Sequence, residues 1–219
     1  LDDESIRDEK VKLLQSIRPM TEEDVARRVV RGQYFAGMMD GEMRPAYRQE
    51  QKVSPTSNVE TYAAMKLFVD NWRWNGFPFY LRTGKRMKDK VTQVVITYKD
   101  NPHSLFPETD DDANNRLIIN LQPNEGIQLE MVSKKHSLKE RMGVEKRVLN
   151  LDFFDSEGEA RIPDAYERLI LEVIKGDQWL FVSRDEIEAS WRWCDTLLDA
   201  WVDQKIGTKA YSAGSLGPA

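Results

Sequence analysis

The sequence of 219 residues predicts an α+β fold, in which α-helices pack on one face of a large, mostly antiparallel β-sheet. Two observations support this class. The middle of the chain is a series of short segments with two-residue alternation, rich in Val, Ile and aromatic residues, and helical segments follow it. The connections between the strand segments are short turns or acidic loops, whereas parallel pairing requires a crossover of about a dozen residues or more.

The N-terminal part begins with a helix and a strand. The spacing of its apolar residues predicts a helix over 5–17, with Ser5 as the N-cap and Pro19 as the residue that ends it. Strand-like spacing follows at 29–34. The segment 37–57 is polar and interrupted by Gly and Pro, so we expect a long surface loop there.

The predicted strands of the central part begin after this loop. They cover 61–74, 79–82, 91–99, 116–122, 126–133 and 146–153. Pro78 has no N–H to donate, so it belongs at the first position of its strand. Gly84 lies where that strand ends, and we expect it to adopt a positive φ.

Two helices and a tail complete the chain. The first helix covers 164–175, between Pro163 and Gly176. The second opens with a capping box, Ser-Arg-Asp-Glu at 183–186. Its apolar face is expected to comprise Ile187, Trp191, Cys194, Leu198, Trp201 and Val202. The final residues, rich in Gly and small polar side chains, are predicted to form a tail.

Composition restricts the class of protein. The net charge of -5 argues against nucleic acid or an anionic membrane as a partner. The single cysteine, Cys194, excludes an internal disulfide and fits a reducing compartment. No apolar run approaches the roughly 20 residues that span a bilayer. We therefore expect a cytoplasmic protein without a membrane partner.

One stretch carries a specific resemblance. Residues 71–86, Asn-Trp-Arg-Trp-Asn-Gly-Phe-Pro-Phe-Tyr-Leu-Arg-Thr-Gly-Lys-Arg, resemble the signature of glucose-6-phosphate dehydrogenase, in the domain that follows its nucleotide-binding domain. Further matches occur in order at 5–11, 30–34, 121–125, 163–170 and 214–218. These colinear blocks cover nearly the whole chain, which is therefore identified as similar to the C-terminal β+α domain of that family.

The resemblance implies that 1–219 form a single substrate-binding and dimerisation domain, with the N-terminal Rossmann domain missing. No Gly-rich dinucleotide-binding turn occurs in the sequence, and in the family the catalytic histidine also lies upstream. We thus expect no catalytic, cofactor-binding or metal-binding residue here, NADP bound by the missing domain, and an inactive fragment. His103 and His136 are expected to be exposed structural residues.

Three residues are candidates for substrate binding. The resemblance implies that Lys85 reaches glucose 6-phosphate and that Lys90 is a second basic contact. An ammonium group supplies three donors and a point charge for sugar hydroxyls and phosphate. Gln122 matches a glutamine that touches the sugar in some members, and a carboxamide both donates and accepts. The alternative remains that the lysines are solvated turn residues and that Gln122 bonds the neighbouring backbone.

A second NADP is not expected. Some eukaryotic members hold a structural NADP in this domain through basic side chains on the sheet. At the corresponding positions this sequence has Val91, Val95 and Asn120. Valine cannot pair with phosphate, so the resemblance argues against a structural NADP site and favours a bacterial pattern.

The resemblance therefore implies a parent enzyme that oxidises glucose 6-phosphate to 6-phosphoglucono-lactone with NADP, in the oxidative pentose phosphate pathway. The sheet is expected to form a homodimer or homotetramer interface. The alternative is a free-standing, non-catalytic assembly or regulatory module with the same fold. The absence of an initiator Met favours a truncated enzyme, and the mass of the native protein distinguishes the two.

Overall fold

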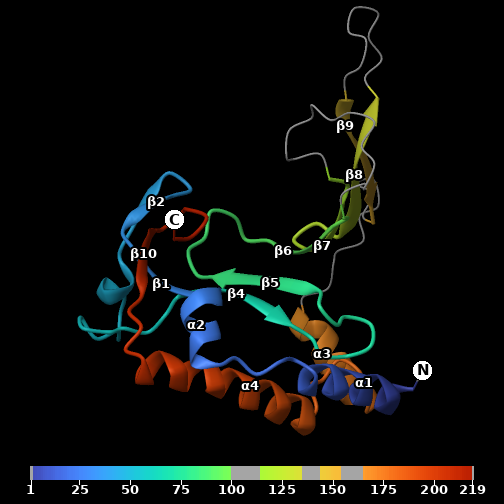
Figure 1. The fold of residues 1–219 in the computed structure, drawn as a ribbon, viewed down its shortest axis with the longest axis horizontal. Helices are drawn as coiled ribbons and strands as arrows, with labels where there is room; N and C mark the ends of the chain where they lie inside the picture. The colour runs from blue at the N-terminus through green and yellow to red at the C-terminus, as the bar shows by residue number, and fades with distance from the viewer. Residues whose placement is uncertain (1, 100–113, 135–143, 154–164, 219) are drawn as a thin grey trace, which may run out of the picture. The chain divides into compact units, whose positions relative to one another are not determined.

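The computed structural model describes residues 2–99, 114–134, 144–153 and 165–218 (Figure 1). Its contacts group into two compact units. The first comprises Leu1–Lys88 with Pro163–Ala219, and the second comprises Asp89–Ile162. The α+β class is confirmed, and most strand pairs are antiparallel. The described strands form one four-stranded sheet in each unit and a two-stranded sheet, where the sequence predicts a single large one.

The sheet of the first unit has the strand order β10-β1-β4-β5. Strand β1 (Val29–Phe35) pairs antiparallel with β4 (Tyr62–Phe68), and β4 pairs antiparallel with β5 (Pro78–Gly84). Pro78 occupies the first position of its strand, as predicted. Strand β10 (Lys209–Ser212) adds to the other side of β1 in parallel.

The prediction of a C-terminal tail is wrong, because this segment belongs to the core. Tyr211 and Ala213 are each only 3% exposed. The loop after β10 passes so close to other backbone that side chains do not fit. A Cβ on Gly214 would lie 2.2 Å from the carbonyl oxygen of Met38, and one on Gly37 would lie 2.3 Å from that of Ala213. Glycine, which is typical of loops, here permits the close approach of two backbones.

Residues 71–76 form a turn, although the sequence predicts that the strand beginning at residue 61 continues to Trp74. The side-chain oxygen of Asn71 accepts hydrogen bonds from the backbone N–H groups of Arg73 and Trp74, at 3.1 and 2.9 Å. An Asn side chain that satisfies its own backbone in this way competes with a strand ladder. The strand ends at Phe68 for this reason, and Trp72 is 99% exposed.

The predicted loop 37–57 contains a hairpin and a turn of 3₁₀-helix. Strands β2 (Gly37–Met39) and β3 (Glu42–Arg44) pair across Asp40 and Gly41, which have φ of 54° and 79°. The 3₁₀-helix η1 (Tyr47–Gln49) follows. An Asp-Gly pair at positive φ is the typical two-residue hairpin turn, so the sequence held a signal that the loop prediction overlooked.

Four helices are described, and two of them begin at identifiable caps. They are α1 (Asp3–Gln15), α2 (Glu22–Arg28), α3 (Ala165–Lys175) and α4 (Arg184–Asp203). The N-cap of α1 is Asp2 and not Ser5, because the Asp2 carboxylate accepts from the Ser5 amide at 2.7 Å. The predicted capping box of α4 is confirmed: Ser183 and Glu186 exchange hydrogen bonds of 3.2 and 2.7 Å.

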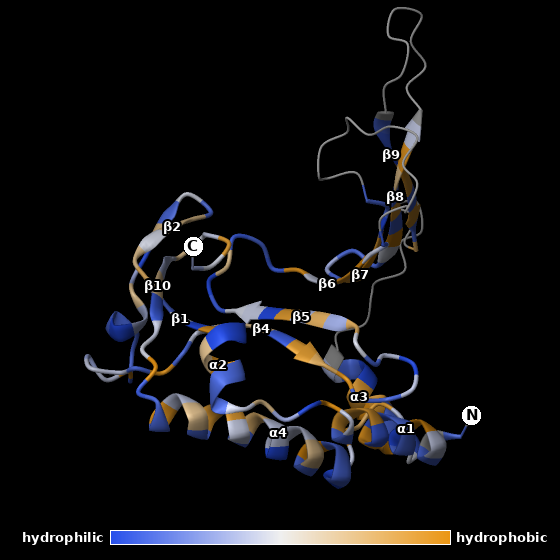
Figure 2. Ribbon diagram, in the orientation of Figure 1, coloured by the Kyte–Doolittle hydropathy of each residue, from blue (hydrophilic) through white to orange (hydrophobic). Residues whose placement is uncertain are grey.

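Helices α2 and α4 cover one face of the sheet in the first unit (Figures 1 and 2). The core there joins Val25 of α2 and Met65 of β4 to Leu197, Ala200 and Trp201 of α4. The predicted apolar face of α4 is only partly correct. Trp201 is buried and Leu198 packs against this core, but the exposed fractions of three other members are high, with 45% for Ile187, 58% for Trp191 and 74% for Val202.

The second unit is an antiparallel meander of four described strands. They are β6 (Thr92–Thr97), β7 (Arg116–Gln122), β8 (Gly126–Lys134) and β9 (Val144–Asp152). The bounds of β7 coincide with the predicted ones.

His103 and His136 lie outside the described residues. Among the described residues, no helix combines the length and the hydropathy required to cross a membrane.

Candidate functional site

Lys85 lies directly after β5 in the first unit, and its backbone is held on both sides. Its N–H donates to the carbonyl oxygen of Thr61 at 2.8 Å. Its carbonyl oxygen accepts from the hydroxyl of Tyr211 at 2.7 Å. The side chain is exposed, and its ammonium group makes no ion pair with any residue that the structure describes. The fold thus presents a cation on an ordered backbone.

Gly84 does not adopt the positive φ that the sequence predicts. Its role is to leave space, since a Cβ there would lie 2.8 Å from the sulfur of Met87 and 2.9 Å from the ring of Tyr62. The left-handed conformation falls instead on Arg86, with φ of 51°. The prediction failed because glycine serves close packing as often as it serves a turn.

Arg86, unlike Lys85, has a carboxylate partner. Its guanidinium lies 3.1 Å from Glu50, and the hydroxyl of Tyr34 donates to the same carboxylate oxygen at 3.1 Å. These donors hold the pKa of Glu50 below its ordinary value, and the bond to Glu50 raises the pKa of Arg86. The positive charge of Arg86 is therefore compensated locally, and that of Lys85 remains available.

The other two predicted substrate residues belong to the second unit. Lys90 precedes β6, and Gln122 is the last residue of β7. Thr92 pairs with Gln122 across the two strands, so Lys90 and Gln122 lie near the same end of this pair. Both side chains are exposed. The structure therefore brings these two to one strand end, and Lys85 lies in the first unit.

The residues that the resemblance places at the structural NADP contacts are also described. Val91 and Val95 are exposed, and Asn120 is partly buried on β7. Gln93 is the strand partner of Asn120. None of these side chains carries a positive charge, so they offer an anion no ion pair.

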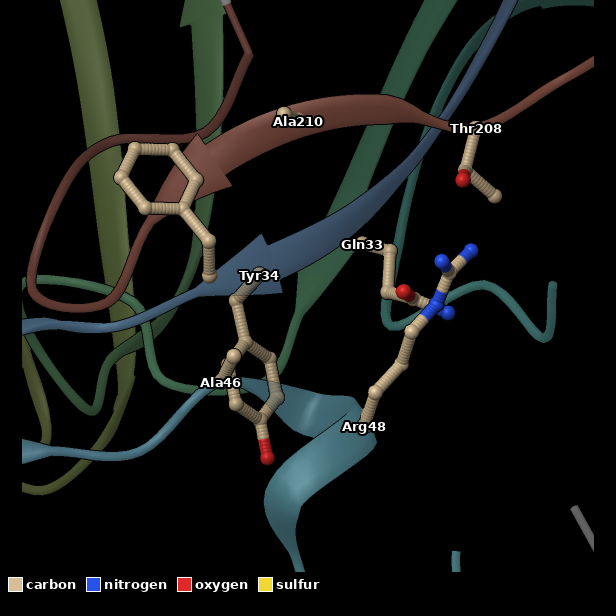
Figure 3. A pocket seen from close by; sticks show the side chains of 7 residues that line it. Gln33, Tyr34, Ala46, Arg48, Thr208 and Ala210 are labelled. Carbon is tan, nitrogen blue, oxygen red and sulfur yellow. The ribbon is translucent and has the colours of Figure 1, made fainter. Parts of the chain in front are cut away.

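A hollow in the described part of the first unit is lined by residues other than Lys85. It has a volume of about 280 Å³, and Figure 3 shows its lining. Arg48 at its edge donates to the carbonyl oxygen of Ser57 at 2.8 Å and to the side chain of Asn58 at 2.9 Å. This arginine supports the neighbouring loop. The lining residues are Gln33, Tyr34, Phe35, Ala46, Arg48, Thr208 and Ala210.

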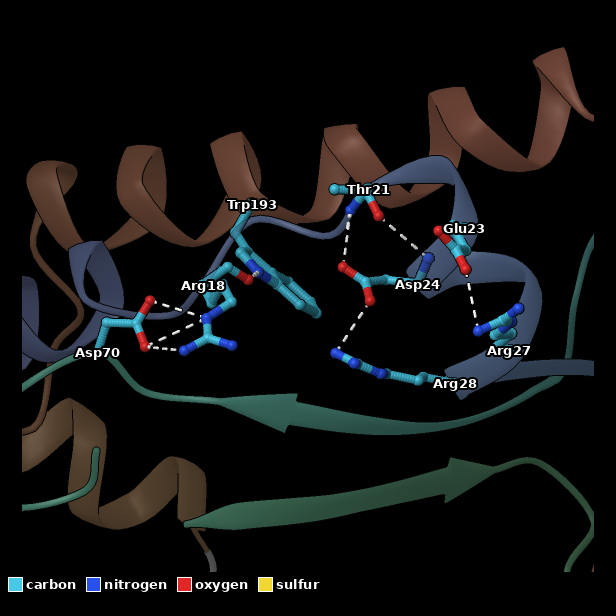
Figure 4. Close-up of polar contacts among 8 residues, drawn as sticks. All are labelled: Arg18, Thr21, Glu23, Asp24, Arg27, Arg28, Asp70 and Trp193. Carbon is cyan, nitrogen blue, oxygen red and sulfur yellow. Dashed lines mark hydrogen bonds and ion pairs between the residues drawn. The ribbon is translucent and has the colours of Figure 1, made fainter. Parts of the chain in front are cut away.

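A polar network joins the segment after α1 to β4 and α4 (Figure 4). Arg18 donates to both carboxylate oxygens of Asp70, at 2.6 and 2.9 Å, and its carbonyl oxygen accepts from the indole of Trp193 at 3.2 Å. The Arg18 guanidinium holds the pKa of Asp70 below its ordinary value. Its contacts are all within the protein, so this network stabilises the fold.

Within the described ranges, no three His, Cys, Asp or Glu side chains gather as a metal site. Arg73 and Arg82 are exposed and form no ion pair with a described residue. The residue that sequence reasoning missed is Tyr211. No local signal identifies it, because its contacts with Thr61 and Lys85 arise from the pairing of β10 with β1.

A comparison with known families decides the relationship. The family model described as "Glucose-6-phosphate dehydrogenase, C-terminal domain" matches residues 1–219. The chain belongs to this family. The resemblance carried by residues 71–86 and the colinear blocks is thereby confirmed.

Individual glucose-6-phosphate dehydrogenases agree with this placement. The glucose-6-phosphate 1-dehydrogenase of Dickeya dadantii is 42% identical over 219 residues, with 100% of this chain and 45% of the relative covered. That of Rhizobium meliloti is 43% identical over 221 residues, with 100% of this chain and 44% of the relative covered. The chain spans less than half the length of these relatives.

Solved structures match equally well in fold. A glucose-6-phosphate dehydrogenase "in complex with its substrate glucose-6-phosphate" has a TM-score of 0.78 and 32% identity, with 100% of this chain and 43% of that chain covered. The glucose-6-phosphate 1-dehydrogenase from Mycobacterium avium has a TM-score of 0.77 and 26% identity, with 100% of this chain and 42% of that chain covered.

Proposed function

We propose that this chain is the substrate-binding and assembly domain of an NADP-dependent glucose-6-phosphate dehydrogenase of the pentose phosphate pathway. The full enzyme oxidises glucose 6-phosphate to 6-phosphoglucono-lactone. The observation that carries the proposal is the family match over residues 1–219, supported by 42% identity to the Dickeya dadantii enzyme over the whole chain.

Lys85 is the proposed principal contact to the substrate. Its exposed ammonium group has no ion-pair partner among the described residues, so binding an anion requires no competing contact to be broken. Its backbone is fixed by two hydrogen bonds, which orders the base of a long, flexible side chain. A cation held in this way neutralises a phosphate or donates to sugar hydroxyls.

Lys90 and Gln122 are proposed to supply further contacts to the same substrate. Lys90 adds a second positive charge for an anionic ligand. Gln122 can both donate to and accept from a hydroxyl group, so its carboxamide suits a sugar better than a phosphate. Their common position at one end of the β6–β7 pair supports a shared ligand.

We propose that residues outside this chain bind NADP, which would supply the acceptor for the hydride from C1 of the sugar. The residues present here do not fit a dinucleotide, since Val91, Val95 and Asn120 carry no charge for its phosphates. The role of this chain is to bind and orient glucose 6-phosphate, and the chain alone is proposed to be inactive.

The second proposed role is assembly through the sheet of the second unit. Strand register places two apolar rows on one face of this sheet, and directly opposite residues point to the same side. One row is Val94, Ile119, Ile127 and Leu151, and the other is Ile96, Leu117, Leu129 and Leu149. The outer members are exposed, and a continuous apolar face of this kind is typical of a subunit interface. We propose that a second copy of the enzyme covers it.

The proposed function is tested with the full-length protein and with the 219-residue chain. The full-length protein should reduce NADP in the presence of glucose 6-phosphate, and the chain alone should not. A full-length protein that folds and binds neither compound would refute the enzyme assignment and favour a non-catalytic assembly module.

A further inference from the structure

We propose that Tyr211 is a positioning residue for substrate binding, which acts by fixing the backbone of Lys85. The inference rests on the proposed contact between Lys85 and glucose 6-phosphate. It assigns a role to a residue that lies far from Lys85 in the sequence and touches no ligand itself.

The distances around the Tyr211 hydroxyl indicate which oxygen accepts its hydrogen. The Tyr211 hydroxyl lies 2.7 Å from the carbonyl oxygen of Lys85, and 3.0 and 3.1 Å from the hydroxyl and carbonyl oxygens of Thr61. A phenol has one hydrogen, and the shortest of these contacts takes it. The Thr61 hydroxyl accepts from the N–H of Tyr34, so its own hydrogen is free for the phenol oxygen of Tyr211.

The same three residues close a cycle of satisfied polar groups. The N–H of Lys85 donates to the carbonyl oxygen of Thr61, while the Lys85 carbonyl accepts from Tyr211. Tyr211 is 3% exposed, and burial raises the pKa of its hydroxyl. The phenol therefore stays a protonated donor. Without it, the partly buried carbonyl oxygen of Lys85 would lose its phenol donor, which is costly in a low-dielectric environment.

Tyr211 is itself rigidly held. Its ring packs against the rings of Tyr34 and Tyr62, with centroids 6.2 and 5.5 Å away. Strand pairing places it opposite Tyr34, in the parallel ladder of β10 and β1. A donor that is fixed by both a ladder and two rings cannot easily follow a movement of the Lys85 backbone, so it resists that movement.

This support is needed because the ladder ends at this point. The last pair of β4 and β5 is Tyr62 with Gly84, and Arg86 already has a left-handed conformation. Lys85 therefore lies between a strand end and a strained residue. Fixing its Cα reduces the conformational freedom that is lost when the side chain binds a ligand, and such preorganisation increases affinity.

The test is the Tyr211→Phe variant of the full-length enzyme, assayed for oxidation of glucose 6-phosphate. Loss of the hydroxyl should raise KM for this substrate by about three- to tenfold, with a smaller change in kcat. The matched control is Tyr62→Phe. Its ring belongs to the same cluster, but its hydroxyl bonds to no described residue, so KM should change by less than about twofold.

A double-mutant cycle separates positioning from a general structural effect. In a Lys85→Ala background, the further change Tyr211→Phe should leave kcat/KM unchanged, because its effect passes through the Lys85 side chain. Equal fold-losses in both backgrounds would overturn the inference. If Lys85→Ala alone has normal kinetics, the proposed function fails. If only Lys85→Ala is impaired and Tyr211→Phe is normal, the inference alone fails.

A second variant covers the case in which Tyr211→Phe does not fold. Thr61→Ala removes the hydroxyl that orients the phenol, which should weaken the bond from Tyr211 to Lys85. It should raise KM in the same direction by a smaller factor, and this rise should also vanish in the Lys85→Ala background. An unchanged KM would overturn the inference.

Discussion

Replacing Lys85 by alanine in the full-length protein should lower kcat/KM for glucose 6-phosphate and leave the free energy of unfolding nearly unchanged. The proposed contact of Lys85 with the substrate is a hydrogen bond from a charged donor, and such a bond contributes about 1.5–3 kcal/mol. This corresponds to a loss of kcat/KM for glucose 6-phosphate of about ten- to a hundredfold. The side chain is exposed and both of its backbone hydrogen bonds survive the change. The free energy of unfolding should therefore stay within about 0.5 kcal/mol of the parent protein.

The matched control is Lys88→Ala, which removes the same charge from an exposed lysine in the same segment. Steady-state assays at several substrate concentrations and urea unfolding on both variants give the comparison. Equal kinetics in the two variants would refute the assignment, because they would show that any lysine near this strand end contributes only to the general electrostatic field. A large loss of stability in Lys85→Ala would show that the side chain supports the fold.

Three further predictions concern stability and assembly. Gly214→Ala places a Cβ against a carbonyl oxygen at φ of 82°, so it should lower the free energy of unfolding by more than about 2 kcal/mol. Gly41→Ala is the control, because it has open space at φ of 79°, and it should lower the free energy of unfolding by only about 1 kcal/mol. Urea unfolding measures both. Asp70 has a pKa lowered by its arginine partner, so its contribution to stability is present above the ordinary pKa of about 3.9 and is lost as pH falls through the lower folded value. The stability difference between the parent protein and Asp70→Asn should shrink over that acidic range, and a constant difference in pH-dependent urea melts would contradict this. Leu149→Lys should dissociate the assembled enzyme in sedimentation velocity, whereas Asn150→Lys, on the opposite face of the same strand, should not.

Local patterns in the sequence were sufficient for many elements of this fold. The bounds of β7 follow from alternation of apolar residues, and the start of α4 follows from Ser183 and Glu186, since a capping box depends only on neighbours in the chain. The turn at Asn71 was missed because the same aromatic residues that favour a strand can follow an Asn that bonds its own backbone. The loop around Gly214 was missed because this glycine approaches the backbone of Met38 in β2, which is far away in the sequence.

The candidate site was predictable only by resemblance. Nothing in composition or spacing separates Lys85 from Lys88, because both are exposed lysines in one basic segment. The family motif makes that distinction. Thr61 and Tyr211, the partners that hold the backbone of Lys85, could not be predicted from either source of information. They meet only when the four strands β10, β1, β4 and β5 have paired.

The parallel pairing of β10 with β1 has a consequence for biosynthesis. Strand β10 is synthesised long after its partner Val29–Phe35, so the sheet of the first unit cannot close during translation of the residues between them. Until then, Thr61 and the backbone of Lys85 lack their phenol partner. A premature stop codon before Lys209 would remove β10, and it should leave the edge of β1 open to pairing with other chains.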